Sequence, residues 1–548
     1  MSRLSARRFA AVLVALVAGM SQASAITDVQ KLTAASSDAR VVIEWANPAA
    51  EADLQGVLVL ARAGAPVGDV PTTGAAYLQG DTIGASTVRC NVSSPVSSCT
   101  IGGLTNGTSY YFKLFTRDTS LNYSAGVDVA ASPRASSDVR WSFATAASAL
   151  NPTGAISGRS VVGIGNDGLL HRMSEADGTR GNWTPPLVGG AVQSRPMVGD
   201  LNPGGAPDDT AFSSAQNGFL YRYSMADDAA LDAARNVVVD AGCPGGMLQS
   251  GPVIIVDAFD GNSNNNDNVV IQATRCGDVN GDGTLNDNKI LLYSHDLSTL
   301  YATYPSGAGS LGISNATPYV LYRDSANNVV YVPVHDAGGP SLLVLEIDST
   351  PAFQVFSTIS GIGDIDAPPA MFRKGTDPLM VVGNTTGNIY LYLALVQSAG
   401  PGTPLVQRDT LNAGDGGVKA VAASTAIPAG GNLFDHWVVW STDTKVHGVM
   451  VPPNGAFESS TVWHANIASA SAPLVLRNVR TPGDVLVYVG GANGTLYELN
   501  ATNGSVLRSW SLAPGTTVGD PTFDYNDGVH QGIVVGTTAG TIHWVPIN

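Results

Sequence analysis

One short pattern recurs from about residue 140 to the end of the sequence, and it limits the available folds more than any single motif. A proline is followed by an apolar segment and then by a polar or acidic residue, as in "SRPMVGD" at 194, "SGPVIIVD" at 250 and "SAPLVLRN" at 471. An apolar segment, a glycine turn and a second apolar segment come next, as in "VLVYVGGANGTLYELN". Such self-similarity indicates that each copy is one supersecondary unit packed against its neighbours.

The segments within each copy have the features of antiparallel strands. Apolar residues alternate with polar ones, and Asn-Gly, Thr-Gly and Ala-Gly pairs supply the positive φ angles that tight hairpins need. About eight units of about 50 residues fill the region, which is the size of a β-propeller blade. The sequence therefore predicts an all-β chain whose residues 135–548 form a closed β-propeller of eight blades, with seven blades as the alternative.

The segment "RWSFAT", residues 140–145, precedes the first complete copy of the pattern. We expect it to complete the last blade and so to close the ring. Closure removes exposed strand edges, which would otherwise pair with other chains and promote aggregation.

Residues 26–134 have a different pattern and are expected to form a β-sandwich. Segments such as "ARVVIEWANP" alternate as half-buried strands do, between Gly, Pro and Asn turns. Trp45 in an early strand and the segment "LTNGTSYYF", which contains Leu104, Gly107, Thr108 and Tyr110, resemble the fibronectin type III domain. The resemblance implies a tyrosine corner and a role as a spacer or a binding module.

The first 25 residues have the three parts of a secretory signal peptide. Arginines at positions 3, 7 and 8 precede an apolar run, and the segment ends in the small residues Ala-Ser-Ala. We expect cleavage before Ile26 and export to the periplasm, the cell surface or the extracellular space. A membrane anchor is the alternative, but the apolar run is shorter than the roughly 20 residues of a spanning helix. No later stretch of the sequence is long and apolar enough to span a membrane.

The four cysteines agree with export. An even number of cysteines in an exported chain indicates disulfide bonds. Proximity in the sequence favours pairing Cys90 with Cys99 and Cys243 with Cys276. No two cysteines are adjacent, and none lies in a haem-attachment motif.

An acidic stretch at residues 275–289, "RCGDVNGDGTLNDNK", has the spacing of a loop that binds a hard cation. Counted from its first aspartate, oxygen-bearing side chains fall at positions one, three, five and nine, and Gly283 supplies the bend at position six. The pattern resembles the calcium loops of EF-hand and dockerin modules and the D-x-N-x-D-G loop of FG-GAP-type propellers. The expected ligands of a structural calcium ion are Asp278, Asn280, Asp282, Thr284 through its carbonyl, Asn286 and Asp287.

The acidic stretch also departs from the EF-hand pattern. Lys289 stands at position twelve, where an EF-hand has a bidentate carboxylate, so Asp287 is the nearest substitute. The following "KILLYSHD" indicates a strand, whereas an EF-hand needs a helix. We therefore expect calcium to bind with modest affinity within an Asp- and Asn-rich insertion at residues 257–289, with an unoccupied polar turn as the alternative.

Two segments of the repeat region resemble known propeller families. Residues 492–510, "ANGTLYELNATNGSVLRSW", resemble the repeat of quinoprotein-like propellers. Residues 198–224 are similar to part of the propeller of PilY-type pilus tip adhesins, in which an Asp-rich calcium loop precedes a strand. Gly204 replaces the central carboxylate of that loop, so calcium is not expected there. The loop positions that do match are Asp200, Asn202 and Asp208.

Composition and missing motifs argue against several classes of function. The net charge of −16 and the lack of a basic stripe argue against nucleic-acid binding. The sequence has no H-E-x-x-H zinc motif and no G-x-S-x-G nucleophile elbow. It also lacks the adjacent cysteines that cover the quinone in many quinoprotein dehydrogenases, so no catalytic residue is assigned.

The sequence therefore indicates an exported, non-catalytic binding or adhesion protein whose calcium-stabilised propeller contacts an extracellular protein or polysaccharide. The alternative is a quinoprotein-like dehydrogenase or a polysaccharide-active propeller enzyme, because propellers host enzymes and receptors alike. A binding protein needs exposed recognition groups, whereas an enzyme needs polar groups that converge in a pocket of the central channel.

Overall fold

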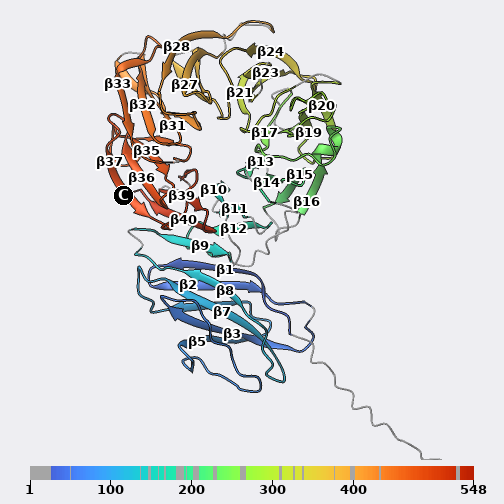
Figure 1. The fold of residues 1–548 in the computed structure, drawn as a ribbon, viewed down its shortest axis with the longest axis vertical. Coiled ribbons are helices and arrows are strands. Elements are labelled where there is room, and N and C mark those ends of the chain that lie inside the picture. Colours follow the sequence, from blue (N-terminus) through green and yellow to red (C-terminus); the bar gives the residue numbers. More distant parts are fainter. Residues whose placement is uncertain are drawn as a thin grey trace, which may run out of the picture.

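The computed structural model is almost entirely β-structure (Figure 1). Within the part of the chain that it describes, α1 (Val237–Asp240) is the one helix, and no helix has the length and hydropathy needed to cross a membrane. The predicted signal segment lies outside the described residues, as does most of the PilY-like loop. The described residues are 26–49, 51–135, 138–145, 150–157, 160–165, 168–180, 191–192, 194–201, 209–225, 231–259, 267–307, 311–324, 327–335, 339–374, 377–394, 401–430, 433–468, 470–525 and 531–547.

Two packed sheets form the N-terminal part of the structure, in the lower half of Figure 1. Alternating residues of both sheets place Trp45, Val57 and Phe112 in one buried core. The first sheet contains β1 (Gln30–Ser37), β2 (Arg40–Ala46) and β6 (Ser98–Gly102). The second sheet contains, in spatial order, β4 (Thr82–Ile83), β5 (Ser86–Ser93), β3 (Leu54–Ala63), β7 (Tyr110–Asp118) and β8 (Val127–Ala131).

Two local contacts stabilise this sandwich. The disulfide Cys90–Cys99 joins β5 to β6 and therefore crosses from one sheet to the other, which confirms the pairing predicted from proximity. The phenol oxygen of Tyr110 accepts a hydrogen bond from the backbone N–H of Thr105, 3.0 Å away. This hydrogen bond ties the loop before β7 to its own strand, as a tyrosine corner does.

The remaining strands form a ring of antiparallel sheets, the upper part of Figure 1, with the arrangement of a β-propeller. Eight such sheets lie within the described residues, and strands that are neighbours in the chain pair in almost all of them. The first four contain β10 (Leu150–Ser157), β11 (Ser160–Gly165) and β12 (Leu170–Ser174); β13 (Met197–Asp200), β14 (Asp209–Ser214), β15 (Phe219–Ser224) and β16 (Leu231–Asn236); β17 (Val253–Ile255), β18 (Val269–Ala273), β19 (Ile290–Ser294) and β20 (Leu300–Tyr304); and β21 (Tyr319–Asp324), β22 (Asn327–Pro333), β23 (Leu342–Ile347) and β24 (Gln354–Ile359).

The other four sheets continue around the ring, and the labelled first strands β10, β13, β17 and β21 lie on its inner side in Figure 1. In one of them the additional strand β30 (Ile427–Gly430) pairs with β31. These sheets contain β25 (Ala370–Lys374), β26 (Asp377–Gly383), β27 (Asn388–Leu393) and β28 (Val406–Asn412); β29 (Ala420–Ala423), β31 (Leu433–Ser441), β32 (Val446–Val451) and β33 (Glu458–Ala465); β34 (Leu474–Arg477), β35 (Val485–Gly490), β36 (Thr495–Asn500) and β37 (Val506–Ser511); and β38 (Thr522–Asp524), β39 (Gly532–Thr537), β40 (Thr541–Pro546) and β9 (Trp141–Thr145).

The hairpin turns of the ring have the glycines that the sequence pattern predicts. Gly387, between β26 and β27, has a φ of +89°, and a Cβ there would lie 2.7 Å from the carbonyl oxygen of Gly416. Gly494, between β35 and β36, has a φ of +76°, and a Cβ there would collide with the backbone of Ala513. Only glycine combines this φ with so close an approach of another backbone segment. The turns therefore fix both the hairpins and their contacts with the next connection.

Apolar side chains hold each sheet against its neighbours. Phe212 and Leu291, for example, belong to one buried cluster that spans the second and third sheets. A cluster of this kind lies between every two neighbouring sheets within the described residues, including the last and the first, where Trp544 meets Val161. The apolar core of the ring is therefore a circle of separate clusters.

The predicted insertion at residues 257–289 is not one continuous loop. β18 runs through it as the second strand of its sheet, and all five of its residues are buried. The polar residues therefore divide between two loops: one before β18, of which residues 260–266 lie outside the described ranges, and one at residues 274–289. Short length and flanking asparagines hide this strand in the sequence, because a polar tract on each side dominates the local pattern.

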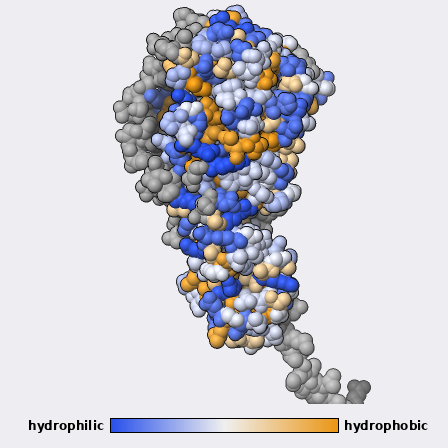
Figure 2. All heavy atoms as spheres, turned by 90° about the vertical axis from the view of Figure 1, so that its left-hand side faces the viewer, coloured by the Kyte–Doolittle hydropathy of each residue, from blue (hydrophilic) through white to orange (hydrophobic). Residues whose placement is uncertain are grey.

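The outermost strands of the ring present both polar and apolar side chains. On β37, Val506 and Leu507 are exposed whereas Trp510 is buried, and Val462 is exposed on β33. Figure 2 shows this side of the molecule, where apolar side chains lie among polar ones. This alternation is typical of strands that bury one face and leave the other in contact with water.

β9 joins the two parts of the molecule. One edge of β9 pairs with β40 from Trp141 to Ala144, which confirms that the segment completes the last sheet. The other edge pairs with β1 of the sandwich, from Ser142 to Thr145. The result is one seven-stranded sheet, β38-β39-β40-β9-β1-β2-β6, that belongs to both the ring and the sandwich.

A side-chain clasp reinforces this junction. Arg180, after β12, donates through its backbone N–H to Oε2 of Glu44 at 2.7 Å. Its guanidinium donates to the carbonyl oxygens of Lys31 at 2.9 Å and Trp45 at 3.1 Å. Because the clasp and the shared sheet use different segments of the ring, the sandwich is held in one orientation.

Deleting residues 140–145 removes β9 and exposes the edges of both β40 and β1. We expect this variant to aggregate, because unpaired strand edges associate with other chains. Deleting residues 26–131 leaves the pairing of β9 with β40 in place and should give a folded ring. Size-exclusion chromatography with light scattering compares the two deletions, and equal solubility would contradict the role of β9 in completing the ring.

Candidate functional site

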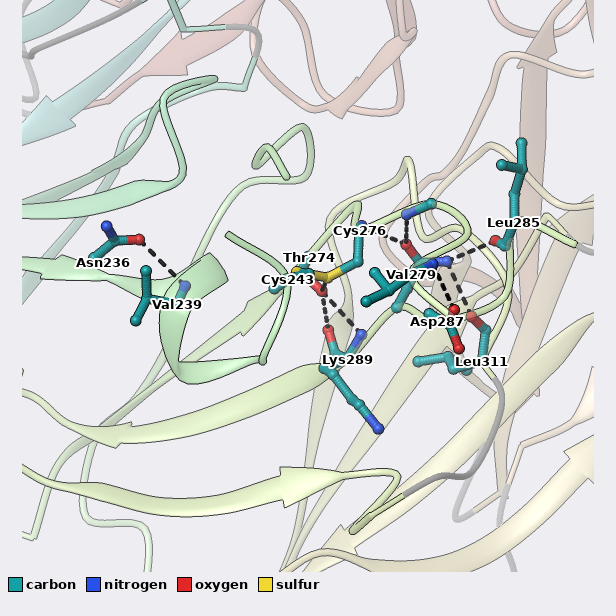
Figure 3. The surroundings of a disulfide bond; sticks show 12 residues. Asn236, Val239, Cys243, Thr274, Cys276, Val279, Leu285, Asp287, Lys289 and Leu311 are labelled. Atoms are coloured by element: carbon teal, nitrogen blue, oxygen red, sulfur yellow. Dashed lines mark hydrogen bonds between the residues drawn. A yellow bond between two sulfur atoms is a disulfide. The ribbon is translucent and has the colours of Figure 1, made fainter. Parts of the chain in front are cut away.

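The candidate metal-binding residues lie in the connection between β18 and β19, residues 274–289. Cys276 in this connection is disulfide-bonded to Cys243, which follows α1 in the connection between β16 and β17 (Figure 3). Beside the disulfide, Met247 and Arg275 form an isolated β-bridge. The disulfide predicted from proximity is therefore present, and it joins the connection between the second and third sheets to a connection within the third.

Asn288 is buried and anchors the base of the acidic loop. Its side-chain nitrogen donates to the carbonyl oxygens of Leu285 at 2.9 Å and Leu311 at 3.0 Å, and its side-chain oxygen accepts from the N–H of Cys276 at 2.8 Å. Asp287 forms a parallel β-bridge with Leu311, which belongs to the following connection. The loop is thus fixed to the sheet before it by the disulfide and to the connection after it by backbone contacts.

Lys289, at position twelve of the loop, is directed to the segment after β20. Its Nζ donates to the carbonyl oxygens of Pro305 at 3.2 Å and Gly307 at 2.5 Å. Burial lowers the pKa of Lys289, although the charge of Asp287 opposes this effect. The lysine therefore orders a neighbouring loop and leaves the middle of the acidic loop without a cationic side chain of its own.

Backbone N–H groups contact the carboxylates of the loop. Asp278 accepts from the N–H groups of Gly281 at 2.7 Å, Asp282 at 3.1 Å and Gly283 at 2.9 Å. Asp282 accepts in turn from the N–H of Thr284 at 2.9 Å. The hydrogen bonds from Thr284 lower the pKa of Asp282, so its charged form is favoured in this exposed segment.

Two carboxylates converge on the side chain of Asn280. Its amide nitrogen lies 3.0 Å from Oδ2 of Asp282 and 3.2 Å from Oδ1 of Asp287, and Asp287 also accepts from the N–H of Val279 at 2.7 Å. The side-chain oxygen of Asn286 is buried and has no hydrogen-bond donor among the described residues. The structure thus brings the predicted ligands into one loop and ties several of them to one another. Within the described ranges, no three His, Cys, Asp or Glu side chains are already placed as a metal site.

A second charged cluster, which was not predicted from the sequence, lies where the β20–β21, β22–β23 and β24–β25 connections meet. Nδ1 of His335 is 3.1 Å from Oδ1 of Asp366, and its Nε2 is 3.5 Å from Oδ2 of Asp364. The side-chain nitrogen of Asn315 donates to Asp366 at 3.0 Å. The sequence offers only the position of these residues in the repeat. Each one follows the second strand of a sheet or precedes the first strand of the next sheet, as the acidic loop and Cys243 do. These residues are far apart in the chain, so spacing alone does not bring them together.

A third cluster surrounds Asp415, which precedes β29. Its Oδ2 lies 2.9 Å from Nε2 of His447 and 3.3 Å from Nζ of Lys445. The imidazole of His447 stacks on Trp440 with ring centroids 5.0 Å apart. Burial lowers the pKa of His447 although Asp415 opposes this, so the imidazole is neutral at neutral pH. The cluster therefore packs a connection against the sheet that follows it.

The residue before the proline of each repeated motif lies where the innermost strand begins. The N–H of Gly251 donates to Oγ1 of Thr317 at 3.0 Å, and the N–H of Ala472 donates to Oδ1 of Asp520 at 2.7 Å. Both hydrogen bonds join one sheet to the next. Burial raises the pKa of Asp520, although the hydrogen bond from Ala472 and the charge of Arg195 oppose the rise. The repeated motif thus links neighbouring sheets at the inner side of the ring.

Comparisons with known proteins give similarity in structure alone. No family model and no curated protein matches the sequence. Among solved structures, BamB from Moraxella catarrhalis has a TM-score of 0.47 with 12% identity over 72% of this chain and 96% of that one. Quinohemoprotein alcohol dehydrogenase from Comamonas testosteroni has a TM-score of 0.47 with 12% identity over 72% and 74%. The computationally designed Ika8 protein has a TM-score of 0.46 with 16% identity over 73% and 96%. These values carry no inference about function.

Replacing Cys243 and Cys276 by serine should destabilise the ring more than the same change at Cys90 and Cys99 destabilises the sandwich. The sequence separation is 33 residues for the first pair and 9 for the second. In the loop-entropy model each loss is about 2 to 4 kcal/mol, and the longer loop adds about 1 kcal/mol. Urea unfolding of the two double variants measures both losses. An equal or smaller loss for the ring pair would contradict this ranking.

Proposed function

We propose that this chain is an exported, non-catalytic binding protein that uses one side of a β-propeller as its recognition surface. In this proposal residues 26–134 form a fibronectin type III-like sandwich, and residues 135–548 form a closed, eight-bladed, quinoprotein-like propeller. The eight consecutive sheets within the described residues, the pairing of β9 with β40 and the Tyr110 corner support it. The signal-like first 25 residues and the two disulfides support export.

The observation that carries this proposal is a chain of cross-links between neighbouring connections. The Cys243–Cys276 disulfide joins the connection between the second and third sheets to a connection within the third, and Asp287 of that connection forms a β-bridge with Leu311, between the third and fourth sheets. His335 continues the series through its β-bridge with Ile313. These contacts hold charged and amide side chains in fixed positions. We call this surface the rim; it comprises residues 274–289, residues 311–315 and His335. A rigid surface loses little conformational entropy when a partner binds, so such a rim suits recognition.

The partner that we propose is an extracellular protein or polysaccharide. Charged and amide groups on the rim can hydrogen-bond with either class, and the similarity of residues 198–224 to pilus tip adhesins favours a surface role. The alternative is a quinoprotein-like or polysaccharide-active enzyme. The sequence has no two adjacent cysteines, and this favours binding over quinoprotein catalysis. A stoichiometric quinone in denatured extract, detected by mass spectrometry, would contradict the non-catalytic proposal.

We also propose that the acidic loop binds calcium as a structural ion. The donors have the right chemistry, since carboxylate, amide and carbonyl oxygens are the ligands that calcium prefers. Asp282 and Asp287 already converge on the amide of Asn280, and Asn286 has a side-chain oxygen without a donor among the described residues. A cation would offset the repulsion between these carboxylates and order a loop that the disulfide tethers. The residues that would hold it are Asp278, Asn280, Asp282, Thr284 through its carbonyl, Asn286 and Asp287.

Calcium should raise the thermal stability of the wild-type protein but not of the double variant Asp278→Ala, Asp282→Ala. We expect a dissociation constant on the order of 10⁻⁵ to 10⁻³ M, because position twelve lacks its carboxylate. At a calcium concentration about 100 times the dissociation constant, binding adds about 2.7 kcal/mol to the free energy of unfolding of the wild type. Differential scanning calorimetry with calcium and with a chelator measures the gain.

Asp348→Ala is the matched control for the calcium experiment. Asp348 lies in the turn after β23 and accepts hydrogen bonds from the N–H and hydroxyl of Thr350 at 2.8 and 2.6 Å, as Asp282 does from Thr284. This variant should keep the full response to calcium. If the double variant responds like the wild type, the loop is a polar turn without a metal.

A photo-crosslinking amino acid tests the recognition surface itself. Leu285 in the acidic loop is 58% exposed, and Val406 on the outer strand β28 is 48% exposed, so the two positions report different surfaces at similar accessibility. Illumination of the producing cells should give a discrete adduct from position 285 and not from position 406. Chelation of calcium should reduce that adduct. Equal labelling from the two positions, or none from position 285, would contradict a recognition role for this rim.

A further inference from the structure

A cleft of about 410 Å³ lies between the sandwich and the ring, away from the acidic loop in sequence. Strands β1, β7 and β8 of the sandwich form one wall, and β9, the β39–β40 hairpin and the connection before β38 form the other. Pockets of about 300 to 1,000 Å³ at such junctions are the usual size and place of small-molecule sites. Because β9 is paired along both edges, the walls of this cleft are already in place.

The lining of the cleft is rich in hydroxyl groups. Eight hydroxyl side chains contribute to it, and no Asp or Glu is present among the residues that line it. This lack of carboxylates contrasts with the net charge of −16 of the whole chain. Tyr111 adds an aromatic ring to the wall. Hydroxyl groups both donate and accept hydrogen bonds, so a surface of this kind complements the vicinal hydroxyls of a sugar.

A buried histidine that lines the cleft is hydrogen-bonded to two of these hydroxyl groups. Nδ1 of His543 lies 2.7 Å from Oγ of Ser142, and its Nε2 lies 2.9 Å from Oγ1 of Thr541. Burial, together with the charge of Arg134, lowers the pKa of His543 to about 3. The imidazole is therefore neutral at neutral pH, with one nitrogen that donates and one that accepts. If it donates to Ser142, the Ser142 hydrogen stays free; if it donates to Thr541, the Thr541 hydrogen stays free for Thr537 or for the cleft.

Arg134 gives the cleft a positive charge. Its guanidinium contacts the carbonyl oxygens of Ser511 and Leu512 and lies 3.4 Å from the carboxylate of Asp138. The Asp138 side chain is 50% exposed, so solvent screens this ion pair strongly. A guanidinium has five N–H donors, so beside these three partners it can form charge-assisted hydrogen bonds with a second carboxylate.

We propose that the junction cleft binds a uronic acid, as a free sugar or as a residue of an acidic polysaccharide. The carboxylate of the sugar would be held by Arg134, its hydroxyls by the Ser142–His543–Thr541 group, and its apolar face by Tyr111. This proposal does not rest on the recognition role of the acidic rim. The two tests use different residues, so either proposal can fail while the other stands.

Isothermal titration calorimetry of the whole protein tests the cleft with glucuronate, glucose and acetate as probes. We expect one glucuronate per chain, with glucose and acetate each at least about tenfold weaker because each lacks half of the recognised groups. Galacturonate and tri-galacturonate, which share one sugar, distinguish the two sources of the ligand: tighter binding of the trimer indicates a polysaccharide, and equal or weaker binding of the trimer indicates a free sugar. No binding of either glucuronate or tri-galacturonate would overturn the proposal.

Two variants place the binding in the cleft. Ser142→Ala should weaken glucuronate binding about fivefold, as expected for one lost hydrogen bond, and Ser509→Ala on the exposed face of β37 should leave it unchanged. Arg134→Gln should abolish the preference for glucuronate over glucose while glucose binding persists. This preference is a readout that loosening of the junction alone would not produce. An unchanged affinity in Ser142→Ala, or an unchanged preference in Arg134→Gln, would overturn the assignment to this cleft.

Discussion

The hydrogen bonds along both edges of β9 are the constraint on which the rest of the structure depends. A strand at the end of a sheet normally leaves one row of N–H and C=O groups unpaired. Here β40 satisfies one row and β1 satisfies the other. The last sheet of the ring is thereby completed, and the sandwich is attached to it through a shared sheet. A covalent connection alone would leave the two parts free to rotate.

The same constraint explains why the two proposed sites differ in character. The junction cleft is preformed because β1, β9 and β40, which contribute to its walls, are each paired along both edges, and its buried His543 stays neutral. The acidic loop instead depends on local cross-links, namely the disulfide and the hydrogen bonds of Asn288. A loop has no hydrogen bonds between paired strands to hold it in place. Carboxylate side chains are tolerated there since the loop is exposed, whereas no Asp or Glu is among the residues that line the cleft. The more enclosed junction cleft is therefore lined by hydroxyl groups, whereas the exposed loop carries the carboxylates.

Features that depend on nearby residues could be predicted from the sequence. Gly387 and Gly494 mark hairpins because the turn needs a positive φ, and the cysteine pairs follow from short separations. Contacts between distant residues could not be predicted in this way. Neither the second partner of β9 nor the meeting of His335 with Asp364 leaves a local pattern. For the acidic loop, spacing predicted which oxygens lie close together, but not that Asp278 would accept three backbone N–H groups.

The position of β9 in the chain also bears on the order in which the molecule assembles. Ser142 on β9 and His543 on β40 are 401 residues apart, so the pairing that completes the ring needs nearly the whole chain. The pairing of β9 with β1 spans about a hundred residues and can form as soon as the sandwich has folded, because closing a shorter loop costs less entropy. The folded sandwich then acts as a template that holds β9 extended, with its second edge ready for the last strand to arrive.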